Sequence, residues 1–428
     1  MKTLFVSLLL LGGTAVAEEH LTLADALKMA RDNHPTLQNA EATLEVMKAR
    51  QWQAMGPLLP QINATAQYLR AQGTYSRVSG GGAGAPATAV PSNLFSFGLS
   101  GSQLLWDFGV IERFRAAGYV KEAQEATVRA TELQISLGVR RAYFAASAQL
   151  TLMKVYEQII DNAAIHVREI EGLASASQRT AIDVAQAKTQ VANARLNFIN
   201  ARNAYQVALA NLNAAIGARE THQWVIDELQ LGPIEGEEDS LDNLVKRAVE
   251  SRPEIVSLRR TEQAWAAQSL AAVGGYMPTL SLTGAISEAG QNIEALGFNW
   301  SFGVLLNWNL VNGGVTTGLF REALHQKEAT QALLDVQLLQ VRVDVETAQA
   351  TIRNQAAAVE AAQVAVDAAT AQLKLAEAQL KVGLGTTIVL SDAQLQFTNA
   401  NSLLVQAQFN LSTARAQLLA ALGVPNDQ

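Results

Sequence analysis

Four stretches of the chain alternate polar and apolar residues with a period of two. In Gln61–Tyr68 every odd position is polar and every even position is apolar, and three later stretches repeat this alternation, with Leu305 as the one exception in the last. Because successive side chains of a strand point to opposite faces, this period predicts β-strands with one polar and one apolar face. The predicted strands are 58–69, 94–106, 278–288 and 298–310.

The polar face of these strands is predicted to line an aqueous pore, with the apolar face in lipid. Strands of about ten residues with this alternation, and with aromatic residues near their ends, are typical of outer-membrane barrels. A soluble sandwich is the alternative, because alternation alone does not distinguish lipid from a protein core. The predicted pore-facing residues are Gln61, Asn63, Thr65, Gln67, Ser96, Ser100, Thr279, Ser281, Thr283, Asn299, Ser301, Asn307 and Asn309.

Four strands are too few to close a barrel in a membrane, which takes at least about eight. An open sheet edge in lipid would leave backbone groups unpaired, at a cost of several kcal/mol each. We therefore expect the strands to be shared among copies of the chain. Four strands per chain are compatible with either a dimer or a trimer.

The remaining sequence is rich in Ala and Gln and forms long helical patterns. In the last of these, alanines recur at every seventh position, at Ala393, Ala400, Ala407, Ala414 and Ala421. This period predicts coiled-coil packing with close helix approach, for which an intramolecular bundle is the alternative. Together with the strands, it favours an α+β membrane protein with a long α-helical coiled-coil barrel and a transmembrane β-barrel shared among subunits.

The chain contains an internal duplication. Pro35 and Pro60 recur as Pro253 and Pro278 at one offset, which is the pattern of a structural repeat. Each repeat is predicted to contain a helix, two strands, a long helix, a tip turn and a returning helix. The predicted segments are a signal peptide at 1–17, a first repeat at 18–217 with its tip turn near 172–180, a linker at 218–239, and a second repeat at 240–428 with its tip turn at 382–386.

The first segment has the features of a secretory signal. A positive start at Lys2 precedes an apolar run at 4–11 and a small-x-small site at 15–17. This arrangement predicts a secretory signal peptide and export of the mature chain. Beyond it, no run approaches the roughly 18 apolar residues that a membrane-spanning helix needs.

Composition excludes several classes of function. With 32 Lys and Arg against 39 Asp and Glu, and no basic block, the chain is not expected to bind nucleic acid. It contains no cysteine and only five widely separated histidines, so we expect no metal and no cofactor. An enzyme would need an organised set of catalytic groups, and no nucleophile motif or cofactor fingerprint is present.

These elements together resemble the TolC family of outer-membrane efflux and secretion channels, over essentially the whole mature chain. The resemblance lies in the order of helix, strand pair, long helix, tip turn and returning helix, which occurs twice. It implies a homotrimer in the outer membrane whose helices form a tunnel across the periplasm. It also implies passive export of cargo in a tripartite efflux pump or type I secretion system. An inner-membrane pump would deliver that cargo, directly or through a periplasmic adaptor.

The resemblance also implies a gate at the periplasmic end. Acidic residues just past the tip turns can ring that entrance, and Asp183 and Asp392 occupy such places. The alternative is that each is an ordinary acidic residue near a helix N-terminus, favoured by the helix dipole. Two positions depart from the family pattern, because Val389 replaces a second acidic residue and Gly385 replaces an arginine. We therefore expect a gate with less acidic charge and fewer ionic contacts.

The tip of the second repeat is the candidate contact for an adaptor. Val382, Gly383 and Leu384 would present apolar side chains beside a conformationally permissive glycine. The alternative is that they pack the end of the helical hairpin. The rival function is an exported periplasmic coiled-coil adaptor or scaffold, which would lack lipid-facing strands. The residues do not distinguish among drugs, metal ions, siderophores and polypeptides as cargo.

Overall fold

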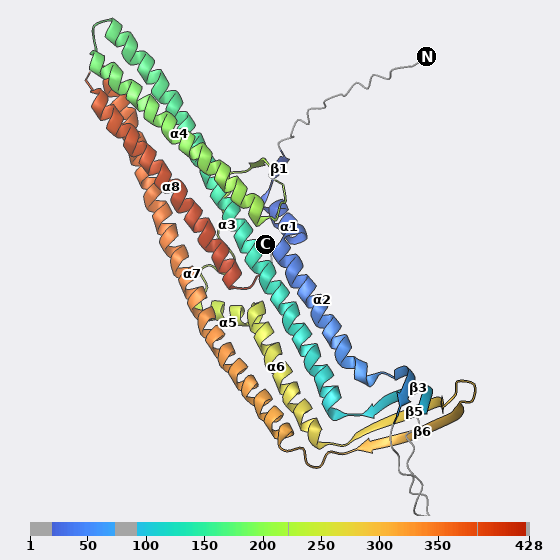
Figure 1. The fold of residues 1–428 in the computed structure, drawn as a ribbon. Coiled ribbons are helices and arrows are strands. Elements are labelled where there is room, and N and C mark those ends of the chain that lie inside the picture. Colours follow the sequence, from blue (N-terminus) through green and yellow to red (C-terminus); the bar gives the residue numbers. More distant parts are fainter. Residues whose placement is uncertain (1–18, 73–91, 221, 383, 425–428) are drawn as a thin grey trace, which may run out of the picture. The chain divides into compact units, whose positions relative to one another are not determined.

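The structure is a computed structural model that describes residues 19–72, 92–220, 222–382 and 384–424 (Figure 1). The predicted signal peptide and Gly383 lie outside these residues. The helices are α1 (Leu23–Asn33), α2 (Pro35–Met55), α3 (Phe108–Ser175), α4 (Ala181–Ala215), α5 (Leu241–Ser251), α6 (Pro253–Val273), α7 (Val315–Lys381) and α8 (Thr387–Ala421). The strands are β1 (Glu19–Leu21), β2 (Gln61–Ala71), β3 (Ser92–Trp106), β4 (Trp224–Ile226), β5 (Thr279–Gly290) and β6 (Gly297–Asn307).

The chain forms two compact units, and neither corresponds to one sequence repeat. The helical unit comprises residues 1–40, 129–253 and 338–428, and the sheet unit comprises residues 41–128 and 254–337. Each unit takes segments from both repeats, because equivalent segments of the two repeats pack together. In the described part of the chain, no helix combines the length and apolarity needed to cross a membrane.

The sheet unit contains a four-stranded antiparallel sheet in the order β2-β3-β5-β6. The two hairpins β2-β3 and β5-β6, one from each repeat, meet through β3 and β5. A bulge between Leu104 and Trp106 interrupts the pairing of β3 with β5. Strands β2 and β6 are therefore the edges of the sheet.

The two largest differences between the predicted and observed strand ends are at the start of β2 and at the end of β6. The predicted strand 58–69 begins only at Gln61, because residues Gly56–Leu58 form a 3-10 turn closed by the Leu59 N–H and the Gly56 carbonyl, 3.0 Å apart. The predicted strand 298–310 ends at Asn307, so Asn309 is not a strand position. Asn307 pairs with Thr279, the first residue of β5, and β5 offers no partner beyond it.

In the helical unit, the alanine stripe marks the buried side of the returning helices. The small residues Ala187, Ala194, Ala201 and Ala208 are buried on α4, and Ala393, Ala400, Ala407, Ala414 and Ala421 are buried on α8. Small side chains let neighbouring helices approach closely. Large residues alternate with these alanines at the same seven-residue spacing. Leu212 and Leu418 are fully buried, and the others are half-buried: Val191, Phe198, Tyr205, Phe397, Leu404 and Leu411.

Both returning helices end in the same way. Gly217 follows α4 with φ 73° and Gly423 follows α8 with φ 66°, a conformation that favours glycine. A Cβ at Gly217 would lie 2.8 Å from the Cα of His34, and one at Gly423 would lie 3.0 Å from the Cα of Arg252. His34 and Arg252 each precede the proline that starts the next helix, so the duplication includes this contact.

The core of the helical unit gathers around the short parallel pair β1-β4. Tyr143 and Phe144 of α3 are buried there with Leu21, Leu212 and Trp224. The Tyr143 hydroxyl donates to the Leu21 carbonyl at 3.1 Å, and the Trp224 indole N–H donates to the Asn213 Oδ1 at 2.7 Å. The buried Tyr143 hydroxyl and Trp224 indole N–H therefore each have a partner, as burial away from water requires.

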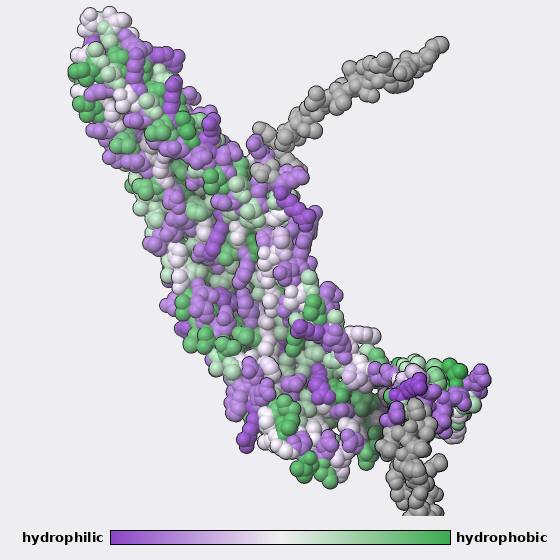
Figure 2. Space-filling view, viewed as in Figure 1, coloured by the Kyte–Doolittle hydropathy of each residue, from purple (hydrophilic) through white to green (hydrophobic). Residues whose placement is uncertain are grey.

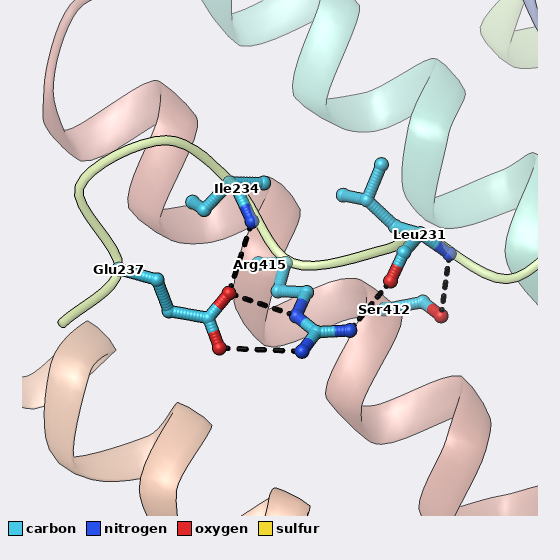
Figure 3. A network of polar contacts seen from close by, with 5 residues as sticks. All are labelled: Leu231, Ile234, Glu237, Ser412 and Arg415. Atoms are coloured by element: carbon cyan, nitrogen blue, oxygen red, sulfur yellow. Dashed lines mark hydrogen bonds and ion pairs between the residues drawn. The ribbon is translucent and has the colours of Figure 1, made fainter.

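A polar network fastens the segment after β4 to α8 (Figure 3). The Arg415 guanidinium donates to both carboxylate oxygens of Glu237, at 3.0 and 3.3 Å, and to the Leu231 carbonyl at 2.7 Å. The Leu231 N–H donates to the Ser412 hydroxyl at 3.2 Å, and the Ile234 N–H donates to Glu237 at 3.1 Å. The side chains of Arg415 and Glu237 are only 12% and 14% exposed, so this bidentate pair is largely shielded from water.

Candidate functional site

One face of the sheet carries most of the polar residues of the four strands. Residues paired in register share a face, so each row of partners crosses the whole sheet. One row is Asn63, Ser100, Ala285 and Ser301, and the next toward the β5-β6 turn is Thr65, Gly98, Ser287 and Asn299. The registers bring the predicted polar positions of β2, β3, β5 and β6 onto one face. Leu305, the exception in the alternation, pairs with Ser281 on this same face.

The opposite face is apolar and exposed. Ile62, Leu99, Trp300 and Phe302 lie on it with large exposed fractions. Apolar surface over the strands is visible in Figure 2. A contiguous exposed apolar face of this kind marks contact with a membrane or another protein.

Aromatic residues lie near both ends of this sheet. At the end next to the β5-β6 turn, the rings of Tyr68 and Phe95 lie 4.8 Å apart, and the Tyr68 hydroxyl donates to the Asn93 Oδ1 at 3.3 Å. At the other end, the Trp308 indole N–H donates to the Tyr276 carbonyl at 3.0 Å. Aromatic rings with a polar tip suit the boundary between lipid and water, so their place near both ends of the sheet is typical of a sheet in a membrane.

The second part of the site is the pair of tips in the helical unit. The reversal between α3 and α4 places Ser177 at φ 60°, in the left-handed region. Helix α3 continues to Ser175, so the turn is shorter than the predicted 172–180. Helix α4 then begins with a reciprocal capping box. The Thr180 N–H donates to Asp183 at 2.9 Å, and the Asp183 N–H donates to the Thr180 hydroxyl at 3.3 Å.

Two contacts join this tip to the tip between α7 and α8. The buried Thr387 hydroxyl lies 2.7 Å from Asp183 Oδ1 and 3.0 Å from Gln186 Oε1, and is shared between them as a donor. The Arg179 guanidinium donates to the Gly385 carbonyl at 3.2 Å and to the Leu380 carbonyl at 3.5 Å. The two helical hairpins are therefore held together at their ends by side chains from the first and second repeats.

The two predicted gate residues have different surroundings. Hydrogen bonds from the Thr180 backbone N–H and from the Thr387 and Thr180 hydroxyls lower the pKa of Asp183 below its ordinary value of 3.8. The stabilisation from the ionised group is present above that ordinary pKa and is lost as the pH falls through the lowered pKa. Asp392 is exposed on the first turns of α8. The structure thus places Asp183 in the contact between tips and Asp392 on the surface beside it.

Arg179, Gln186 and Thr387 were missed from the sequence, although one signal pointed to Arg179. Ala187 of α4 and Ala393 of α8 are equivalent positions of the two repeats, and they are 206 residues apart. The same separation relates Arg179 to Gly385. The arginine absent from the second tip is thus present in the first tip and reaches across to the glycine carbonyl. In the described part of the chain, no group of three or more His, Asp or Glu residues is arranged to hold a metal ion.

Comparisons with known proteins agree with this arrangement. The model of the family described as "Outer membrane efflux protein" matches residues 26–218 and 244–424. The chain is 25% identical over 419 residues to the outer membrane protein TolC of Vibrio cholerae, covering 95% of this chain and 91% of that protein. It is 26% identical over 440 residues to the outer membrane efflux protein BepC of Brucella suis, covering 99% and 90%.

Solved structures share the fold. The outer membrane protein VceC from Vibrio cholerae aligns with a TM-score of 0.76 at 19% identity, covering 94% of this chain and 96% of VceC. The same fold is shared by the channel structures of CusC and of CmeC from Campylobacter jejuni. The chain belongs to the outer membrane efflux protein family, and it is an outer-membrane efflux channel.

Proposed function

We propose that copies of this chain assemble into a single duct that conducts cargo passively from the periplasm to the exterior. In this proposal the β2-β3-β5-β6 sheets close into one transmembrane β-barrel, and the helices form a coiled-coil tunnel in the periplasm. The chain would serve a tripartite efflux pump or a type I secretion system after removal of its signal peptide. Energy would come from partners, since the sequence contains no nucleotide-binding motif.

The observation that carries this proposal is the sheet, which has a polar face, an apolar face and two edges without a partner strand among the described residues. An unpaired edge in lipid is unfavourable by several kcal/mol for each backbone group. Neighbouring strands are antiparallel throughout, so β2 and β6 run in opposite directions. An edge β6 of one copy therefore suits antiparallel pairing with β2 of the next copy.

A homotrimer would give twelve strands from three four-stranded sheets, an even number within the range of outer-membrane barrels. A dimer would give eight strands, which is also within that range. The resemblance to the TolC family favours the trimer. Native mass measurement of the detergent-solubilised assembly distinguishes the two stoichiometries.

We place the adaptor contact at the tip between α7 and α8. Val382 is 69% exposed and Leu384 is 84% exposed, and Ile388 on the first turn of α8 adds further apolar surface. Such a cluster at a helix end suits the end of another coiled coil. The partners would be a periplasmic adaptor and, through it or directly, an inner-membrane pump.

We place the periplasmic gate at Asp183 and Asp392. We expect the Asp183→Ala/Asp392→Ala variant to show increased single-channel conductance and reduced cation preference in planar bilayers. Removing Asp183 deletes one of the two acceptors of the Thr387 hydroxyl at the tip contact, and removing both residues deletes carboxylates near the entrance. Glu235→Ala, on an exposed loop of the helical unit, is the control. Unchanged conductance and ion preference would remove both residues from the gate.

A matched pair of substitutions tests the membrane face. Phe302 and Ser301 are neighbours on β6 that lie on opposite faces of the sheet. We expect Phe302→Arg to reduce the amount of protein assembled in the outer membrane, because arginine facing the lipid costs about 2–4 kcal/mol at the bilayer centre. Ser301→Arg should assemble normally and change conductance. Equal assembly of the two variants would contradict the barrel and favour an adaptor or scaffold that is not embedded in lipid.

A further inference from the structure

The polar face of the sheet carries no charged side chain in β2, β3, β5 or β6 as the structure describes them. The row through Gln61 continues with Ser102, Thr283 and Gly303, and the row through Gln67 continues with Ser96, Ala289 and Gly297. The two rows between them contain only asparagine, serine, threonine, glycine and alanine. The face therefore offers amide and hydroxyl groups, which both donate and accept hydrogen bonds.

The charged residues of these strands are both on the other face. The strands contain only Arg70 and Glu288. Glu288 pairs with Phe97 and with Phe298 in the apolar rows, and Arg70 pairs with Asn93. Charged residues make up 17% of the whole chain, so their absence from the polar face departs from the average composition.

We infer that the strand-lined section of the duct is neutral and passes anionic, cationic and uncharged polar solutes without selecting by the sign of charge. This inference rests on the proposed function, because it requires the polar face to line the pore. Rings of charged side chains are what give a pore its preference for one sign, and each charge would recur in every subunit. A neutral face of hydroxyls and amides hydrogen-bonds to solutes of either sign, so any charge preference of the channel must arise outside the polar face of these four strands.

The absence of cysteine provides a direct test on the full-length assembly. Ser100 lies in the middle of the polar face and Leu99 is its neighbour on the apolar face. Ser100→Cys and Leu99→Cys assemblies in outer membranes would each be treated with a cationic and an anionic methanethiosulfonate reagent of similar size. For each variant, the rate with each reagent is divided by the rate of that reagent with 2-mercaptoethanol, which gives a corrected rate. We expect Ser100→Cys to react with both reagents at corrected rates within about twofold, because no fixed charge on its face biases either.

A charged variant calibrates the measurement. Ala285 is the register partner of Ser100 on β5. In an Ala285→Asp background, the corrected cation-to-anion ratio at Ser100→Cys should rise roughly tenfold, since a charge about 5 Å away in water changes each rate severalfold in opposite directions. If the corrected rates of the two reagents at Ser100→Cys differed by that factor in the chain without Ala285→Asp, in favour of either sign, the inference would be overturned. The pore assignment would stay intact.

The apolar-face variant separates this inference from the proposed function. We expect Leu99→Cys to resist both water-soluble reagents, because a thiol in lipid stays protonated and unreactive. Reaction at Leu99→Cys together with protection at Ser100→Cys would mean that the polar face is not the water-filled side. That result would overturn the proposed pore, and the inference with it.

Discussion

The Arg415→Met variant is expected to lose about 3–5 kcal/mol of stability in the helical unit, because it leaves the largely buried Glu237 carboxylate without its bidentate partner. The same change removes the donor at 2.7 Å from the Leu231 carbonyl (Figure 3). The segment that follows β4 would then be held to α8 by the Ser412 hydroxyl alone within this network. Methionine keeps much of the apolar stem of arginine, so the loss reports mainly on the charged contact.

The measurement is the unfolding midpoint of the detergent-solubilised assembly in denaturant, read by circular dichroism. Glu235→Ala is a matched control, because Glu235 lies two residues before Glu237 and is exposed. The double variant Arg415→Met/Glu237→Leu should recover much of the loss, since removing both partners leaves no unpaired buried charge. If Arg415→Met unfolded at the same midpoint as Glu235→Ala, the pair would contribute nothing measurable.

The second large effect is expected from Gly274→Ala in the sheet unit. A Cβ at Gly274 would overlap the backbone nitrogen of Gly109 and lie 2.6 Å from its Cα. Backbone atoms at the start of α3 cannot rotate away as a side chain can, so the added methyl group must separate the two segments. Overpacking of this kind costs about 1–3 kcal/mol, and we expect the upper end of that range.

The internal duplication supplies the control. Gly56 precedes the first strand pair as Gly274 precedes the second, and a Cβ at Gly56 would meet no atom within 4 Å. We expect Gly274→Ala to lower the unfolding midpoint and the amount of assembled protein, with Gly56→Ala close to the unsubstituted chain. Equal effects of the two substitutions would show that the close approach at Gly109 relaxes without cost.

In the strands, the local sequence pattern predicts which face each residue lies on but not where the strand ends. Alternation of polar and apolar residues assigned the two faces correctly along β6, where Trp300 and Phe302 lie opposite Ser301. The same alternation continues through Trp308 and Leu310, yet the strand ends at Asn307. A strand needs a neighbour for its backbone hydrogen bonds, and β5 begins only at Thr279. The pattern of β6 contains no information about where its partner starts.

At the tips, too, local contacts can be predicted from the sequence and contacts between distant residues cannot. The motif around Asp183 identified an acidic residue at the start of a returning helix, and the capping box with Thr180 is a local contact that the sequence suffices to suggest. The contact of Asp183 with Thr387 joins residues 204 positions apart. Likewise, the hydrogen bond from Arg179 to the Gly385 carbonyl joins residues 206 positions apart, and the sequence alone marked Gly385 only as a departure from the family pattern.

The sequence by itself determined the duplication, the faces of the strands and the alanine-lined side of the returning helices, because hydrophobic periodicity depends only on neighbours along the chain. The tertiary structure decided which strands pair, how the repeats divide between two compact units, and which partners Arg415 and Thr387 find. Those contacts join residues far apart in the chain, and their selection depends on packing of the whole fold rather than on any local pattern.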